Sequence, residues 1–223
     1  MADLRWDLPS AAAVEELIRA PLPLGLRAGA PQWTFHRDLY FDTTSGDLRG
    51  RGVTCRLRYD VRDRRWLALD VPGVDRCEAM VSDLDPRVVL AGATEPARRL
   101  RALIDPARLE ILLELEVERR LRPACLPIVR LPQVVLGFDR ITARHRGASL
   151  TFHELVVWRA RGGVLAPAWL GRALARRHEL RAAPSDRLER ALGMHAALAR
   201  EVEAATAERR VGVIAVAHGR LAL

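Results

Sequence analysis

Hydrophobic and polar residues alternate along much of the first 160 residues, in short runs separated by Gly, Asp or Arg-Asp breaks. Alternation with a period of two is typical of β-strands that bury one face. The runs are, in chain order, ADLRWDL, WTFHRDLYFD, GVTCRLRYD, RWLALDV, CEAMVSD, ILLELEVERRLRP, PIVRL, QVVLGFDRITARH and ASLTFHELVVWRA. The sequence therefore predicts about eight antiparallel strands.

Two segments among these strands have a helical pattern instead. Ser10 can cap a helix in which Val14, Leu17 and Ile18 form an apolar stripe. Residues 94 to 110 also read as a helix, with a break at Pro106.

The C-terminal part changes character. LGRALARRHEL predicts a short helix, and DRLERALGMHAALAREVEAATAERR a longer one with an apolar stripe that is typical of core packing. VGVIAVAHG reads as a last strand, which would be exposed unless it paired with the sheet or with another chain.

The order of these elements indicates an α+β protein. We expect an eight-stranded antiparallel β-barrel (a tunnel) or an open barrel, with flanking helices and a C-terminal helix-strand extension. A chain of 223 residues suits one large domain with an appendage. We place the domain at residues 1–192 and the extension, packed on it, at residues 193–223.

Composition excludes several classes. No apolar run approaches the roughly 20 residues of a spanning helix, and the N-terminus lacks the apolar centre of a secretory signal, so a cytoplasmic protein is expected. The three cysteines, Cys55, Cys77 and Cys125, include no CxxC pair and favour neither a disulfide framework nor a zinc site. Signatures of common hydrolases and nucleotide-binding loops are absent from the sequence.

The net charge of +8 favours an anionic partner. All 36 basic residues are arginine, which indicates a compositional bias rather than a function. They are interleaved with 28 acidic residues, and only 5% of residues are aromatic, so a nucleic-acid partner is not expected.

Arg56 and Arg58 are alternate residues of one predicted strand and should point the same way. Facing inward they would line a polar tunnel, whereas facing outward they would only make the sheet soluble. The alternation alone leaves both interpretations open.

Six segments together resemble the CYTH family, the triphosphate tunnel metalloenzymes: YFDTTSGDLRGRGVTCRLR, WLALDVPG, ELEVERRLRP, VVLGFDRITAR, LTFHELVVWRARGG and APSDRLERAL. Their order covers residues 1 to about 192. The resemblance implies an antiparallel tunnel in which basic residues hold a triphosphate and carboxylates hold Mg²⁺ or Mn²⁺. Residue by residue, it implies phosphate-binding roles for Arg56, Arg58 and Arg119, and metal-binding roles for Glu78, Asp139 and Glu154 if metal binding is retained.

The sequence also departs from the family pattern. The family opens with an ExExK strand, where this chain has Asp3-Leu4-Arg5-Trp6-Asp7. Asp70 and Asp186 stand where the family has lysine, and Val156 and Trp158 stand where an acidic row would continue after Glu154.

These departures imply a weakened triphosphate site, because acids replace lysines and several carboxylates of the metal shell are missing. The sequence favours a degenerate CYTH-like domain that binds a phosphorylated or other anionic small molecule, such as polyphosphate, with ordinary triphosphatase activity lost. An alternative is an active Mg- or Mn-dependent phosphohydrolase that uses Glu78, Asp139 and Glu154 together with Asp3 or Asp7. A second alternative is an interaction scaffold, a homodimer formed through the C-terminal extension.

Overall fold

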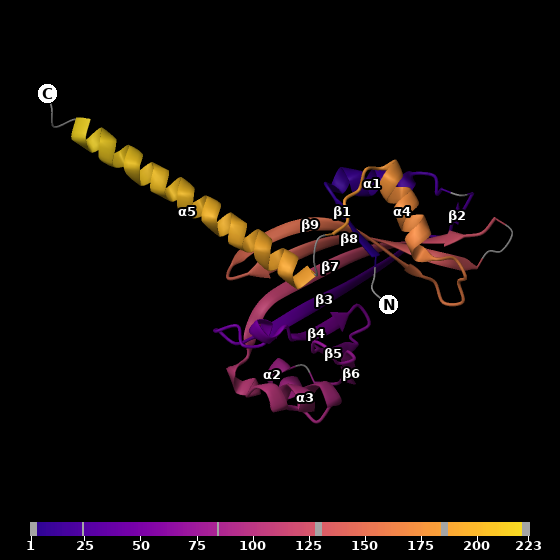
Figure 1. Ribbon diagram of the computed structural model, residues 1–223, viewed down its shortest axis with the longest axis horizontal. Helices are drawn as coiled ribbons and strands as arrows, with labels where there is room; N and C mark the ends of the chain where they lie inside the picture. The colour runs from indigo at the N-terminus through magenta and orange to yellow at the C-terminus, as the bar shows by residue number, and fades with distance from the viewer. Residues whose placement is uncertain (1–3, 24, 84, 128–130, 184–186, 220–223) are drawn as a thin grey trace. The chain divides into compact units, whose positions relative to one another are not determined.

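The computed structural model describes residues 4–23, 25–83, 85–127, 131–183 and 187–219, the last stretch as backbone alone beyond residue 204. The chain divides into two compact units, residues 1–184 and residues 185–223. The first unit contains one large sheet with flanking helices, and the second consists of the helix α5 (Figure 1).

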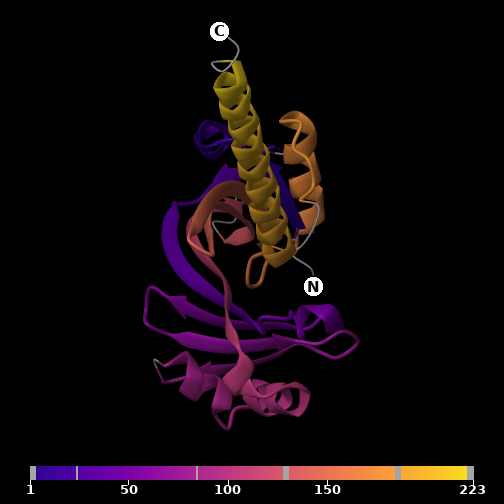
Figure 2. The same ribbon diagram turned by 90° about the vertical axis from the view of Figure 1, so that its left-hand side faces the viewer.

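The sheet has nine antiparallel strands, in the order β1-β9-β8-β7-β3-β4-β5-β6, with β2 paired to β7. Their bounds are β1 (Leu4–Leu8), β2 (Arg27–Ala28), β3 (Gln32–Asp42), β4 (Thr54–Asp60), β5 (Arg65–Asp70), β6 (Cys77–Val81), β7 (Glu110–Cys125), β8 (Pro132–His145) and β9 (Ala148–Arg159). Figure 2 shows how strongly the sheet curves. Within the described residues its two edges, β1 and β6, are not paired to each other, so the sheet is the open form of the two predicted architectures.

The period-two runs are confirmed as strands in eight places. The short β2 was not predicted. The predicted strand PIVRL covers residues 127–131, and its middle part, residues 128–130, lies outside the described residues.

Helices cover one face of the sheet, called the outer face below. Near β1, β9 and β8 it is covered by α1 (Ala11–Arg19) and α4 (Pro167–Arg177), whose residues share a core with Trp6, Leu155 and Val157. Ser10 caps α1 as predicted, because its hydroxyl accepts a hydrogen bond from the backbone N–H of Ala13.

The other end of the outer face has its own core. There α2 (Pro86–Ala91) and α3 (Glu95–Leu103) pack with Cys55, Leu57 and Leu67 of β4 and β5. The predicted break before Pro106 is confirmed, since α3 ends at Leu103 and a 3₁₀ turn, η2 (Pro106–Arg108), follows; a second turn, η1 (Arg49–Arg51), precedes β4. The six-residue α2 was not predicted. A fully buried side chain such as Leu57 contributes about 1.5–3 kcal/mol to folding.

The last predicted strand is wrong. VGVIAVAHG continues the helix α5, which runs without interruption over Arg187–Gly219. A short apolar run has no periodicity that separates strand from buried helix, and extending an existing helix avoids the cost of a new nucleus. None of the helices in the described part of the chain is long and apolar enough to cross a membrane.

Candidate functional site

The face opposite the helices, called the inner face below, carries all six residues that the resemblance assigned to a site. Residues that are directly paired across strands point to the same side of a sheet. The pairs that connect them are Arg58 with Asp38, Thr34 with Arg119, Arg119 with Asp139, Asp139 with Glu154, Arg56 with Ala68, and Ala68 with Glu78. Arg56 and Arg58 therefore point to the same face, as the alternation predicts, and this is the face opposite α1 to α4; their role in binding a ligand stays a prediction.

The arginines of β4 are held by a buried acid on β3. Asp38 is 1% exposed and accepts two hydrogen bonds from Arg58, from Nε at 2.6 Å and from Nη2 at 2.7 Å. Arg56 approaches the same carboxylate at 3.4 Å and Glu78 at 3.9 Å. Burial raises the pKa of Asp38, but the hydrogen bond and charge of Arg58, with the charge of Arg56, outweigh it and hold that pKa at about 2. Asp38 is therefore ionised at neutral pH.

A second arginine–carboxylate pair with two hydrogen bonds of the same geometry lies on β7 and β8. The pairs Arg58–Asp38 and Arg119–Asp139 are called the arginine forks below. Arg119 donates from Nε at 2.6 Å and from Nη2 at 2.7 Å to the carboxylate of Asp139, which is fully buried. The Arg119 guanidinium also lies 5.2 Å from the centroid of the Trp158 ring. A side chain at Gly137 would collide with Trp158, since a Cβ there would lie 2.7 Å from the ring. Glycine at this position thus permits the stacking that orients Arg119.

Arg56, Arg58 and Arg119 remain accessible despite these contacts. Their side chains are 13%, 27% and 20% exposed. A guanidinium has five N–H donors, and a bidentate carboxylate uses two of them. The three arginines can therefore meet a ligand while the acids below them fix their orientation.

The three carboxylates that the resemblance assigned to a metal site, Glu78, Asp139 and Glu154, do not all lie together. Asp139 and Glu154 are paired neighbours and both are fully buried, and Asp7 of β1 extends their row. Glu78 lies on the edge strand β6, where it binds Arg76 at 2.8 Å. Across the ranges that the structure describes, no group of three or more His, Cys, Asp or Glu side chains is placed to hold a metal ion. As arranged here, the three carboxylates do not fit a metal centre, and metal binding by them stays a prediction.

The departures from the family pattern lie on the inner face as well. Val156 pairs with Arg5 and Gly137, and Asp70 pairs with Thr54, which alternates with Arg56. Asp70 approaches Arg76 at 3.7 Å and adds negative charge at the β5 end of the face. Asp186 lies outside the described residues.

Part of the inner face is apolar. Leu115 and Val117 of β7 and Ile141 of β8 share it with Arg119 and Asp139, and all three are fully buried. The inner face therefore has a charged zone and an apolar zone, rather than the continuous polar lining expected of a tunnel.

Asp38 is the main site residue that sequence reasoning missed. It alternates with His36 in the predicted strand WTFHRDLYFD, so its polarity was visible, but no motif marked it. Its role depends on the pairing of β3 with β4, which places it opposite Arg58.

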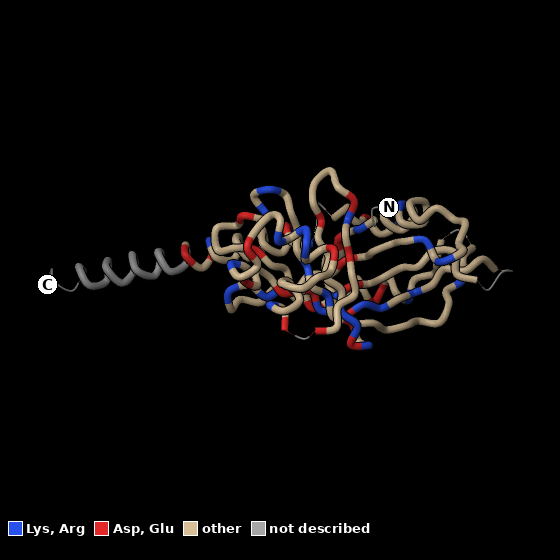
Figure 3. The backbone as a smooth tube through the Cα atoms, turned by 90° about the horizontal axis from the view of Figure 1, so that it is seen from below, with Lys and Arg blue, Asp and Glu red and all other residues tan. Residues whose placement is uncertain are grey.

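Basic and acidic residues are interspersed along the chain rather than separated into blocks (Figure 3).

Comparison with solved structures identifies the class of fold. The chain shares its fold, a curved antiparallel sheet with flanking helices, with solved structures, and this is the fold expected from the resemblance to the CYTH family.

Three neighbours carry this assignment. One is a proposed adenylate cyclase from Bacillus halodurans, with a TM-score of 0.57 at 15% identity, over 84% of this chain and 95% of that one. Another is a proposed adenylyl cyclase from Hippeastrum with a dominant triphosphatase activity, with a TM-score of 0.56 at 16% identity, over 84% and 94%. A protein from Pyrococcus horikoshii OT3 has a TM-score of 0.55 at 14% identity, over 89% and 99%. No family model and no curated protein matches the sequence.

Proposed function

We propose that the inner face binds a phosphorylated or otherwise anionic small molecule through Arg56, Arg58 and Arg119. The observation that carries this proposal is the pair of matched forks, in which a buried carboxylate positions a partly exposed arginine. A guanidinium whose orientation is fixed before binding loses less conformational entropy when an anion binds. The triphosphatase activity of the Hippeastrum protein, which has the same fold, is compatible with a ligand of this kind.

Arg56 is the arginine best suited to exchange partners. Its contacts to Asp38 and Glu78, at 3.4 Å and 3.9 Å, are longer than the 2.6 Å contact of Arg58. A phosphate oxygen can replace such long contacts with short charge-assisted hydrogen bonds, worth about 1.5–3 kcal/mol each. Polyphosphates are candidate ligands because they offer several oxygens to Arg56 and Arg58 of β4.

We further propose that ordinary metal-dependent triphosphatase activity has been lost. Hydrolysis of a triphosphate requires charge neutralisation and a positioned water in addition to binding. Asp38 and Asp139 neutralise two of the three arginines, and the carboxylates that would hold a metal are divided between β6 and the β8–β9 pair. Both features favour binding over turnover.

The test is calorimetric titration of the full chain with tripolyphosphate, with and without Mg²⁺. Arg56→Gln should weaken binding by about tenfold, which corresponds to the loss of one charge-assisted contact. Arg144→Gln is the matched control, since it removes the same charge from the outer face, and should change the affinity less than about threefold. Equal weakening by both variants would mean nonspecific attraction, and no detectable binding would refute the ligand class.

A second candidate is an active Mg- or Mn-dependent phosphohydrolase, for which Asp7, Glu154 and Asp139 supply neighbouring carboxylates, although these described side chains do not form a ready set of three metal ligands. It predicts phosphate release that requires either metal and disappears in Glu154→Gln. Because Glu154 is fully buried, circular dichroism must first show that the variant is folded. Inactivity of the unmodified chain over tripolyphosphate and nucleoside triphosphates would exclude this candidate while leaving the binding proposal intact.

A further inference from the structure

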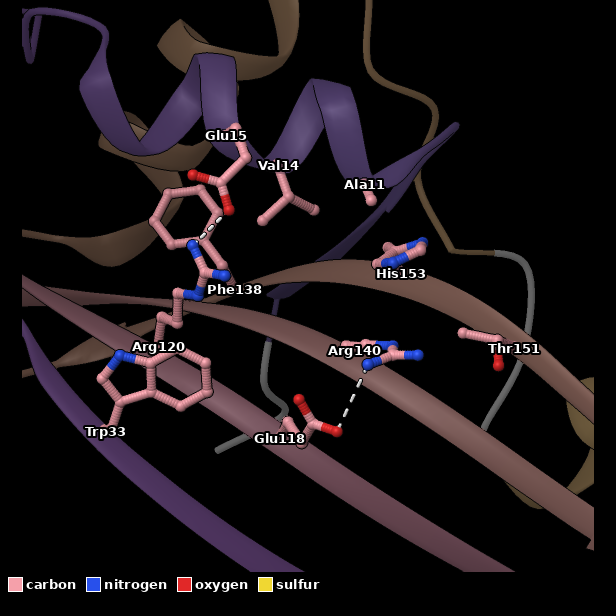
Figure 4. A pocket seen from close by; sticks show the side chains of 10 residues that line it. All are labelled: Ala11, Val14, Glu15, Trp33, Glu118, Arg120, Phe138, Arg140, Thr151 and His153. Atoms are coloured by element: carbon pink, nitrogen blue, oxygen red, sulfur yellow. Dashed lines mark hydrogen bonds and ion pairs between the residues drawn. The ribbon is translucent and has the colours of Figure 1, made fainter.

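A cavity lies on the outer face, away from the arginine forks. Its volume is about 330 Å³, and it is bounded by α1 on one side and by β3, β7, β8 and β9 on the other (Figure 4). Small-molecule sites generally begin at about this size. All of its lining residues belong to the first compact unit.

The floor of the cavity is apolar. Val14 of α1 faces Phe138 of β8, which is 2% exposed, and both belong to the core beneath α1 and α4. Trp33 closes one end and is 63% exposed. The Arg120 guanidinium lies 4.7 Å from the centroid of the Trp33 ring and also binds Glu15 (Figure 4). The cavity thus has room for an apolar group beside a polar wall.

The opposite end carries weakly paired positive charge. Arg140 and His153 are directly paired residues of β8 and β9, so their side chains lie next to each other. The contact of Arg140 with Glu118 is long, at 3.5 Å, and both side chains are exposed, 57% for Arg140 and 43% for Glu118. Ala11, the first residue of α1, lines the same end, where the helix dipole is positive.

We propose that this cavity binds a small organic anion whose apolar body rests on Val14 and Phe138 and whose head group lies between Arg140 and His153. The head group is a carboxylate or a phosphate, since both accept hydrogen bonds from guanidinium and imidazole N–H groups. The proposal is independent of the inner-face ligand, because the two sites lie on opposite faces of the sheet and share no residue.

Burial lowers the pKa of His153, and the charge of Arg140 lowers it further. The charged groups that border the ring are Arg140 from β8, Glu118 from β7, and Glu15 with Arg120 at the far end. The imidazole can donate one N–H hydrogen bond to the head group beside the guanidinium of Arg140.

The experiment follows the His153 ring resonances by NMR in the full chain, with benzoate and phenyl phosphate as probes. His153→Gln assigns the signal. Inorganic phosphate supplies a head group without a body, and benzyl alcohol supplies a body without charge. Both aromatic anions should shift the His153 signals. Each partial probe should bind about tenfold more weakly or worse.

Arg140→Gln should weaken the aromatic anions by about tenfold, while Arg144→Gln, on the same strand and face but outside the cavity, should not. Arg56→Gln should leave the His153 response unchanged, which separates this site from the inner face. The proposal is overturned if neither aromatic anion moves the His153 signals at about 10 mM, a concentration above any specific dissociation constant expected for this site. It is also overturned if inorganic phosphate binds as tightly as phenyl phosphate, or if the two arginine variants behave alike.

Discussion

Arg58 on the inner face and Arg144 on the outer face are both strand arginines that hold a carboxylate at 2.6 Å. Their surroundings differ. Asp38, the partner of Arg58, is 1% exposed, whereas Glu116, a partner of Arg144, is 29% exposed and its arginine 49%. In water a separated pair recovers its hydration, but a buried carboxylate cannot, so the two contacts have different energetic consequences at the same length.

The largest expected effect on stability comes from removing the buried carboxylate of Asp38, the partner of Arg58. Asp38→Asn leaves Arg58 without its carboxylate and should lower the free energy of unfolding by about 3–5 kcal/mol, measured by urea denaturation. Replacing both residues, Asp38→Asn with Arg58→Met, removes the uncompensated charge and should recover part of that loss. If the double variant were less stable than the single one, the pair would not be coupled in the way that the two hydrogen bonds indicate.

The second effect tests the packing that supports the other fork. In Gly137→Ala the new methyl group would lie 2.7 and 2.9 Å from two atoms of the Trp158 ring, which is rigid. We expect a loss of about 3 kcal/mol and displacement of the indole from Arg119, seen as a change in tryptophan fluorescence. Gly50→Ala is the control, since nothing lies within 4 Å of the position that its new methyl group would take and its backbone is not in the left-handed region. Similar losses in both variants would contradict a steric cause.

Whether the sequence could predict a feature of the fold or of the candidate site depends on how far apart along the chain the interacting residues lie. The alternation of Arg56 and Arg58 is local, and it correctly placed both side chains on one face. The resemblance added Arg119, Asp139 and Glu154, which the registers bring to that same face. Local pattern and family order were together sufficient for the eight longer strands and for the face that the arginines share, but not for α2 or for the helical C-terminal end.

The partners of those arginines were not predictable in the same way. Asp38 and Arg58 are 20 positions apart, and they meet only because β3 and β4 pair in one particular register. A shift of one residue would turn Asp38 to the outer face, and no residue type in either strand specifies the register by itself. The outer cavity needs an even longer connection, since α1 contributes Glu15 and β7 contributes Arg120.

The third effect uses acid to break the buried contact. The pKa of Asp38 is about 2 in the folded protein, below its ordinary value of 3.8, so ionised Asp38 stabilises the fold above about pH 4. As the pH falls from about 4 to 2 the unfolded chain binds this proton first, and about 2 kcal/mol of stability should be lost. Urea denaturation at several pH values measures the loss. Asp38→Asn lacks the group, so a pH dependence equal to that of the unmodified chain would assign the effect to other acids.

The smallest effect is expected on the outer face, where Arg144 binds both Glu116 and Glu114 and both contacts are open to solvent. Glu116→Gln should lower the midpoint of thermal unfolding by no more than about 2 °C at low salt, because ions screen such pairs and Glu114 remains as a partner. At about 1 M NaCl the difference should vanish, since the screening length falls to about 3 Å. Asp38→Asn should keep most of its deficit at high salt, because the Asp38 carboxylate is shielded from ions. A salt dependence of equal size in both variants would show that burial does not distinguish the two faces.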